Sequence, residues 1–171
     1  MSVKKILAAG LTIASLAGAW TVPATAEDFV IGAVSARTGF MAAYDAPFMQ
    51  GVSMYIEEAN KMGGLNGKYP IRLVERDDTS DPQKAAISVA ELLKKEKLNI
   101  FISSAISPAA IAAGNMVAKK NLLIMHTIAS QPTIPERAGG GSYLVMMSDA
   151  HMGGVYAKFA HGDLKAKTAY I

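Results

Sequence analysis

The sequence contains no cysteine and only one tryptophan, and aromatic residues make up 7% of its 171 residues. Without cysteine the chain can form no disulfide and carry no lipid on a cysteine, so its stability must come from burial of apolar side chains. A basic stripe with interleaved aromatic residues is also missing, so nucleic acid is not an expected partner. The three histidines lack metal-ligand spacing, and neither a metal nor a cofactor is expected.

Sequence motifs of common enzymes are missing as well. The segment from Gly32 to Gly39 does not follow the G-x-G-x-x-G dinucleotide fingerprint, and no G-x-S-x-G nucleophile elbow occurs. Asp77 and Asp78 form an acidic pair that could hold magnesium in a cytosolic receiver domain, but a turn or capping role suits an exported chain better. The sequence therefore favours a protein that is not an enzyme, and an exported α/β enzyme is the alternative that a measured catalytic rate would support.

One uncharged apolar run stands at the N-terminus, after the basic start MSVKK. It is shorter than the roughly 20 residues that cross a bilayer. Ala24 and Ala26 follow it at the spacing that a signal peptidase requires, so we predict a signal peptide over residues 1–26, cleaved after Ala26, and a periplasmic mature protein. A membrane anchor is the less favoured interpretation. Lys4 and Lys5 leave with the signal peptide, so the formal charge of +3 belongs mostly to that segment.

The remaining sequence alternates between strand and helix patterns. Residues 29–36 form a continuous apolar run, typical of a strand that is buried on both faces of a parallel sheet. Pro47 is expected at the first position of a helix that ends at Gly63 and Gly64, and Asp81 is expected to cap a helix that starts at Pro82. Further strands are predicted at residues 69–76, 98–105, 121–127, 142–148 and 167–171, with helices at 107–120 and 149–166 and a loop at 128–141.

This rhythm predicts an α/β fold, in which right-handed crossovers build an open parallel sheet with helices on both faces. The last strand would stop at Ile171 with no connection beyond it. We therefore expect the chain to be the front part of a longer protein.

In an open parallel sheet, ligands bind beyond the carboxyl ends of the strands. Ser107 would lie at that edge as the N-cap of a helix, where free N–H groups favour an anion. Thr127 and Ser130, in the next loop, could add hydroxyl groups. An ordinary N-cap role for Ser107 stays open, as does core packing for Tyr44, an aromatic residue with a polar tip in the loop after the first strand.

The motifs that follow residue 30, taken in their order along the chain, resemble the start of the periplasmic branched-chain amino acid binding proteins. These proteins are substrate-binding subunits of ABC transporters. The resemblance covers essentially the whole mature sequence. It is carried by the order of these residues: Thr38-Gly39, Gly51, Ala59-Asn60, Gly63-Gly64, Gly67, Asp77-Asp78, Asp81-Pro82 and Ala85.

This resemblance implies a Rossmann-like lobe of a type I periplasmic binding protein, with the second lobe truncated. Residues 27–147 would be the N-terminal ligand-binding lobe, and residues 148–171 the hinge crossing and the start of the second lobe. The family closes two lobes around a small ligand such as an amino acid. A monomer that delivers its ligand to an ABC permease is expected, and a ligand-sensing module of a receptor or regulator is the alternative.

The resemblance also implies which residues contact the ligand. A serine at the start of the third helix, here Ser107, would bind the ligand carboxylate together with main-chain and hydroxyl groups at Ile128 and Ser130, and Tyr44 would line the pocket. The complete set of candidate ligand contacts is Tyr44, Ser107, Pro108, Thr127, Ile128 and Ser130.

Overall fold

The computed structural model describes residues 27–168. The predicted signal peptide and the last three residues of the predicted sixth strand lie outside this range. Lys167 and Thr168, the first two residues of that strand, are described and are not in a strand.

A parallel sheet of five strands forms the centre of the described chain. The strands are ordered β2-β1-β3-β4-β5, and every neighbouring pair is parallel. Their bounds are β1 (Phe29–Ser35), β2 (Ile71–Asp77), β3 (Ile100–Ser103), β4 (Leu123–His126) and β5 (Ser142–Leu144). The predicted open α/β sheet is thereby confirmed.

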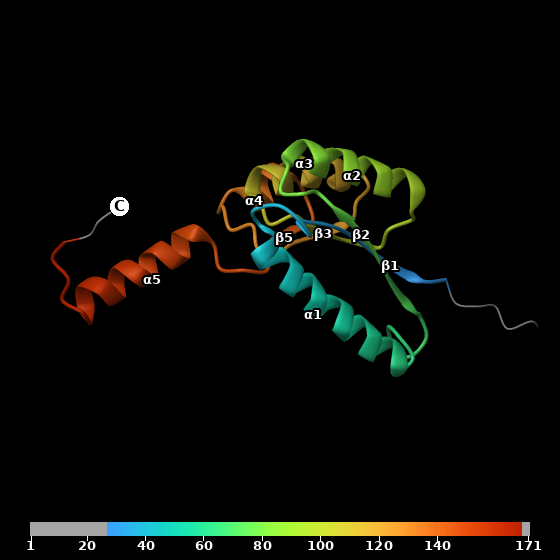
Figure 1. The fold of residues 1–171 in the computed structure, drawn as a ribbon, viewed down its shortest axis with the longest axis horizontal. Helices are drawn as coiled ribbons and strands as arrows, with labels where there is room; N and C mark the ends of the chain where they lie inside the picture. The colour runs from blue at the N-terminus through green and yellow to red at the C-terminus, as the bar shows by residue number, and fades with distance from the viewer. Residues whose placement is uncertain (1–26, 169–171) are drawn as a thin grey trace, which may run out of the picture.

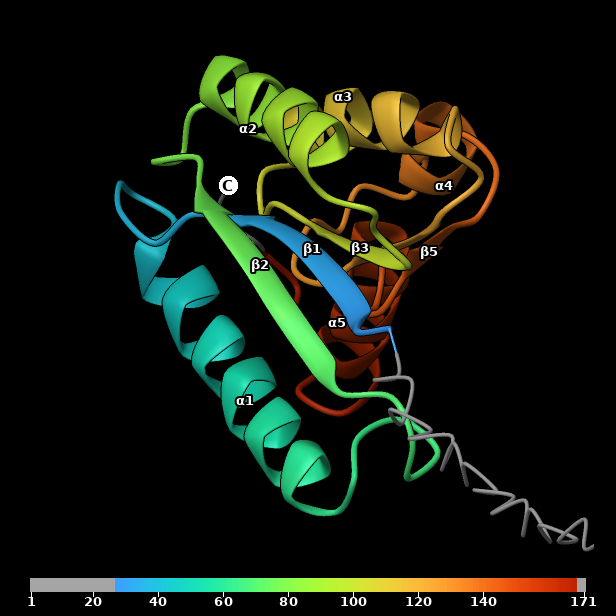
Figure 2. The same cartoon turned by 90° about the vertical axis from the view of Figure 1, so that its right-hand side faces the viewer.

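Helices cover both faces of the sheet, as the sequence predicts. Helix α1 (Ala42–Lys61) lies on one face, and α2 (Pro82–Lys95), α3 (Ser107–Ala118) and the short α4 (Ile134–Ala138) lie on the other, as Figure 2 shows. Helix α5 (Asp149–Gly162) projects away from the other elements in Figure 1. None of its residues is buried.

The two faces bury different side chains because successive residues of a strand point to opposite sides. On the α2–α3 face, Val34 and Phe101 pack with residues of both helices in the largest apolar cluster. On the other face, Ala33 and Ile102 pack against Met49 of α1. Strands buried on both sides explain why their sequences are apolar runs rather than alternating patterns.

Several predicted boundaries are wrong. Helix α1 begins at Ala42 rather than Pro47, which lies inside the helix, and the predicted loop at 128–141 contains α4. Ile106, not Ser107, occupies the N-cap position of α3, and Ser107 is the first residue of that helix. Strands β3 and β5 are shorter than predicted, ending at Ser103 and Leu144.

The prediction for α2 is confirmed in detail. Asp81 is its N-cap, and one carboxylate oxygen accepts hydrogen bonds from the N–H groups of Gln83 at 2.7 Å and Lys84 at 3.0 Å. Pro82 stands at the start of the helix, where its missing N–H costs nothing. Both signals are local, which is why the sequence alone locates this helix.

Candidate functional site

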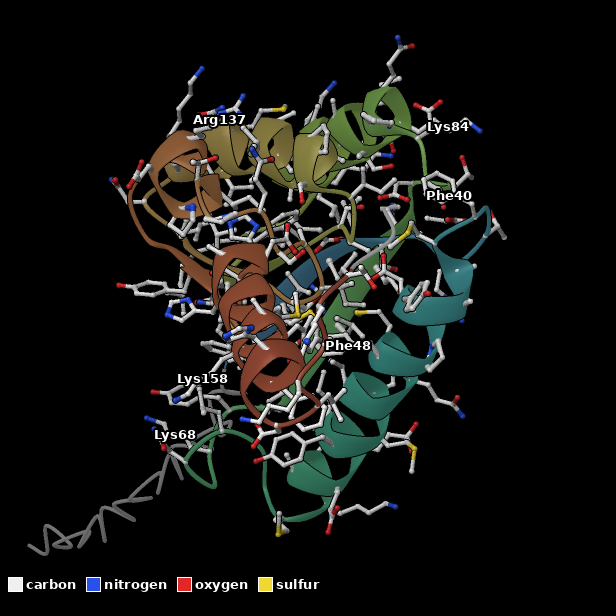
Figure 3. All side chains as sticks on the ribbon, turned by 90° about the vertical axis from the view of Figure 1, so that its left-hand side faces the viewer. Phe40, Phe48, Lys68, Lys84, Arg137 and Lys158 are labelled. Atoms are coloured by element: carbon white, nitrogen blue, oxygen red, sulfur yellow. The ribbon has the colours of Figure 1, made fainter. Side chains whose placement is uncertain are left out.

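The carboxyl ends of the parallel strands gather at one edge of the lobe, and the candidate ligand residues lie there. In Figure 3, Phe40 and Lys84 mark this edge, and Lys68, which precedes β2, lies toward the opposite end of the lobe. Strands β3 and β4 are adjacent, with Ser103 paired to His126. The segments 104–107 and 127–130 therefore leave neighbouring strands at the same level of the sheet.

Ser107 is located where a ligand at this edge could reach it. It is partly exposed at the start of α3, and no side chain caps this helix. The first turn of α3 also contains no acidic residue. The hydroxyl and the first-turn N–H groups therefore form a polar, uncapped helix start that favours an anion. Pro108, the next residue, is exposed.

The three candidate ligand contacts in the loop after β4 differ in their exposure. Ile128 and Ser130 are partly exposed, whereas Thr127 is 7% exposed, and its buried Oγ1 has no hydrogen-bond partner among the described residues. The carbonyl of Ser130 accepts the N–H of Asp149 at 2.9 Å. This bond connects the loop directly to the first residue of α5.

Tyr44 occupies a different kind of position from the one the sequence suggests. It lies in the first turn of α1 rather than in a loop, and it is 64% exposed. Core packing is therefore the wrong interpretation of this ring. The residue after it, Asp45, is buried, so the first turn of α1 presents an aromatic ring outward and a carboxyl group inward.

The acidic pair Asp77 and Asp78, at the end of β2, supports the adjoining loops, as the turn interpretation predicts. Asp77 accepts the N–H groups of Arg37, Thr38 and Thr79 through one oxygen, and the Thr38 hydroxyl through the other at 2.7 Å. Partial burial acts to raise the pKa of Asp77, but the Thr38 hydroxyl and these N–H groups outweigh it and hold the pKa below its ordinary value. This carboxylate fixes the loop after β1.

Asp78 and Asp45 are more deeply buried than Asp77, and their pKa values are raised rather than lowered. Burial raises the pKa of Asp78, although the Ser104 hydroxyl and the Ser80 N–H act against that change. The Ser104 contact falls short of a well-formed hydrogen bond, because the buried Oδ2 of Asp78 has no such partner among the described residues. Burial also raises the pKa of Asp45, with accepted N–H groups acting against it. Two carboxyl groups with raised pKa values thus lie near the carboxyl edge of the sheet.

The three histidines lie at buried structural or exposed positions. His126 is fully buried, and its Nδ1 lies 2.6 Å from the hydroxyl of Ser103. His151 and His161 are exposed on α5. Within residues 27–168, no group of three or more acidic, histidine or cysteine side chains could hold a metal ion, and no helix is long and apolar enough to cross a membrane.

Sequence patterns alone assigned no role to Asp45, although the structure gives it one. A signal for it exists, because Asp45 is the only charged residue between Arg37 and Glu57. A lone acid in a long uncharged segment indicates a specific hydrogen-bonding role. The buried serines Ser103 and Ser104 gave no such signal, since their roles depend on residues that are distant in sequence.

Comparisons with known proteins agree with the α/β fold described above. Residues 28–171 match the family model described as periplasmic binding protein. The Leu/Ile/Val-binding protein homolog 2 of Brucella abortus is 30% identical over 138 residues, which are 81% of this chain and 37% of the relative.

Two solved structures share the fold. The substrate-binding protein LivJ from Streptococcus pneumoniae, solved with isoleucine, is 24% identical, with a TM-score of 0.75 over 82% of this chain and 40% of the other. A solute-binding protein from Rhodopseudomonas palustris, solved with 3,4-dihydroxybenzoic acid, is 21% identical, with a TM-score of 0.71 over 80% of this chain and 36% of the other. The chain thus spans about two fifths of the length of these relatives, all of which are described as binding proteins.

Proposed function

The chain belongs to the periplasmic binding protein family, and from that premise we propose that residues 27–147 are the N-terminal lobe of an extracytoplasmic solute-binding protein of an ABC importer. The lobe binds an amino acid or a similar small carboxylate or amide at the carboxyl edge of its sheet. A second lobe closes over the ligand, and the loaded protein delivers it to the permease. The protein acts as a monomer in the periplasm, after cleavage of the signal peptide behind Ala26.

The observation that carries this proposal is the uncapped start of α3. Ser107 heads a helix whose first turn has neither a capping side chain nor an acidic residue. Such a start attracts a carboxylate, because the N–H groups and the helix dipole favour negative charge there. The isoleucine of LivJ and the 3,4-dihydroxybenzoic acid of the Rhodopseudomonas protein differ in most respects but share a carboxyl group.

The neighbouring residues complete a surface that suits a small solute. Ile128 and Ser130 provide main-chain groups and a hydroxyl from the adjacent loop, and the exposed ring of Tyr44 provides an apolar wall. Thr127 and Pro108 border the same edge. The carboxylate of the ligand then lies at the start of α3, and the side chain of the ligand extends toward α1.

Residues 148–171 would form the first hinge crossing and the start of the second lobe. Two features support this division. Helix α5 has no buried residue, and its side chains Val155, Tyr156 and Phe159 are more than half exposed. Figure 1 shows that the helix leaves the rest of the lobe. Since this lobe would make only part of the ligand contacts, it should bind its ligand weakly when alone.

The test is a titration of the ¹⁵N-labelled chain 27–171 with leucine, isoleucine and 3,4-dihydroxybenzoate, followed by NMR. We expect millimolar binding, with shifts concentrated in two groups of amides, those of residues 105–107 and 109 and those of residues 127–130. Leucinamide, which lacks the carboxylate, should shift the first group much less. Ser107→Ala should weaken leucine binding about tenfold, since a hydrogen bond to a charged group is lost.

Ser53→Ala is the matched control, because Ser53 is a partly buried serine of α1 whose hydroxyl bonds the carbonyl of Met49 one turn earlier. It should leave leucine binding unchanged. Shifts that cluster at the opposite edge around Lys68, or equal binding by the wild type and Ser107→Ala, would contradict the proposed site.

A further inference from the structure

The backbone segments after β1 and β3 meet at a single side-chain oxygen. Oδ2 of Asp45 accepts the N–H of Ala36 at 2.7 Å and the N–H of Ala105 at 3.3 Å. Ala36 follows the end of β1, Ala105 follows the end of β3, and Asp45 belongs to the first turn of α1. One buried carboxyl group therefore connects three elements, and it is only 1% exposed.

The register of the sheet shows why an acceptor is needed at this point. Strands β1 and β3 pair from Ile31 with Ile100 to Ala33 with Ile102, and the pairing ends there. Ala36 and Ala105 both lie three residues beyond the last pair, where the strands no longer bond each other. Their buried N–H groups would otherwise lack partners, which costs free energy. Asp45 connects the segments that follow β1 and β3 beyond the point where the hydrogen bonds between the two strands end.

This junction lies next to two candidate ligand contacts. Tyr44 immediately precedes Asp45 on α1, and Ser107 follows Ala105 by two residues at the start of α3. A change in the spacing of Ala36 and Ala105 would therefore move the aromatic wall and the helix start relative to each other. Both must hold their places for one small ligand to contact them together.

We propose that Asp45 is a positioning residue that sets the distance between Tyr44 and the start of α3, an inference that rests on the proposed ligand edge. It does so through accepted hydrogen bonds and makes no contact with the ligand itself. The charged side chains that act on this carboxyl group are Glu75 of β2 and Asp78 of the following loop, both acidic. The described residues thus give it no ion-pair partner, and its hold on the two loops depends on the two N–H groups.

Asp45→Asn and Asp45→Ala separate this role from a general effect on stability. Both bonds use the same oxygen, so the asparagine carbonyl can accept both of them, whereas alanine can accept neither. Met49→Ala is the matched control, because Met49 lies one turn further along α1 and is 1% exposed in the apolar cluster beneath the sheet. It should lower the melting temperature without touching either N–H group.

The first measurement needs no ligand. In the Asp45→Ala protein, the Ala36 and Ala105 amides should exchange with solvent much faster, and the amide signals of residues 105–107 and 109 should move. In Asp45→Asn and Met49→Ala these signals should remain near their wild-type positions. Wild-type amide signals for residues 105–107 and 109 in Asp45→Ala would overturn the proposal, whether or not any solute binds.

The second measurement is the NMR titration with leucine. Asp45→Ala should weaken leucine binding about tenfold, while Asp45→Asn and Met49→Ala stay within about threefold of the wild type. An equal loss of leucine affinity in Asp45→Ala and Met49→Ala would mean that Asp45 acts only through stability, and it would overturn the positioning role. If leucine fails to bind the wild type, the proposed function fails, and the exchange experiment still decides the role of Asp45.

Discussion

The hydroxyl of Ser103 and Nδ1 of His126 lie 2.6 Å apart inside the lobe, between two residues that are paired across β3 and β4. The imidazole is fully buried, and its Nε2 has no partner among the described residues. Burial disfavours the charged ring and lowers the pKa of His126 to about 4. The folded lobe therefore holds a neutral histidine one residue before the loop that contains Thr127, Ile128 and Ser130.

This burial makes stability depend on pH in a definite direction. The folded pKa of His126 lies below its ordinary value of 6.5, so the unfolded chain takes up the proton first. Its contribution is complete above pH 6.5 and is lost as the pH falls toward 4. The loss amounts to roughly 3 kcal/mol of unfolding free energy. Urea unfolding of the wild type and His126→Gln across this range should show the steeper decline in the wild type.

The buried acids oppose this trend, so the comparison with His126→Gln is essential. The pKa values of Asp45 and Asp78 are raised above 3.8, which means that their neutral forms favour folding and that stability is lost as the pH rises through those values. Both acids are present in the wild type and in the variant, and their effects cancel in the difference. Parallel pH profiles of the two proteins would show that His126 is not buried as a neutral ring.

Ser107 and Asp81 stand at the starts of two neighbouring helices but should respond differently to alanine. Because no side chain caps α3, Ser107→Ala should change the unfolding free energy by less than about 0.5 kcal/mol. Asp81→Ala removes a carboxylate that accepts two N–H groups at the start of α2, so it should lower the melting temperature clearly. A loss of about 1 kcal/mol or more in Ser107→Ala would restore the N-cap interpretation of that serine.

Two helical glycines provide a second matched pair. A methyl group at Gly114 of α3 would collide with the Cβ of Ala138 in α4, whereas a methyl group at Gly51 of α1 would meet nothing within 4 Å. Gly114→Ala should therefore cost about 1–3 kcal/mol of unfolding free energy through overpacking. Gly51→Ala should gain up to about 1 kcal/mol from helix propensity. Calorimetry on both variants checks this, and equal effects would contradict the close packing of α3 on α4.

The fold was predictable because its signals are local and repeated. Apolar runs such as residues 29–36 indicate strands buried on both sides, and Asp81 followed by Pro82 marks a helix start without tertiary information. The errors occur where a residue serves a distant partner. Sequence patterns indicated no role for Asp45, but its carboxyl group accepts the N–H groups of Ala36 and Ala105, which follow two different strands.

The candidate site likewise has features that the sequence predicts and features that depend on tertiary contacts. Its location at the carboxyl edge follows from the alternation of strands and helices, so Ser107 and Ser130 could be placed there from sequence. The exposure of Tyr44 depends on the orientation of the first turn of α1, in which the neighbouring Asp45 is buried, and no local pattern in the sequence specifies that orientation. Helix α4 was missed because its five residues are too few for any periodicity to show.

Helix α5 should contribute little to the stability of the lobe. None of its residues is buried, and an isolated helix of 14 residues is marginal in water. A chain that ends at Asp149 keeps the bond from the Asp149 N–H to the Ser130 carbonyl and should lose less than about 1 kcal/mol of unfolding free energy. Urea unfolding measures this, and amide exchange in the longer chain should show weak protection along α5.

The contrasting truncation removes β5 as well. A chain that ends at Gly141 loses the pairing of β5 with β4 and the contact of Leu144 with the cluster around Ile134. It also loses the bond from the Val145 N–H to the His126 carbonyl. This chain should unfold at clearly lower urea than the one that ends at Asp149, because it exposes an edge of the sheet and part of its core. If the chain that ends at Asp149 already lost as much stability as this one, and clearly more than about 1 kcal/mol, α5 would be part of the folded lobe and the proposed boundary at residue 147 would be wrong.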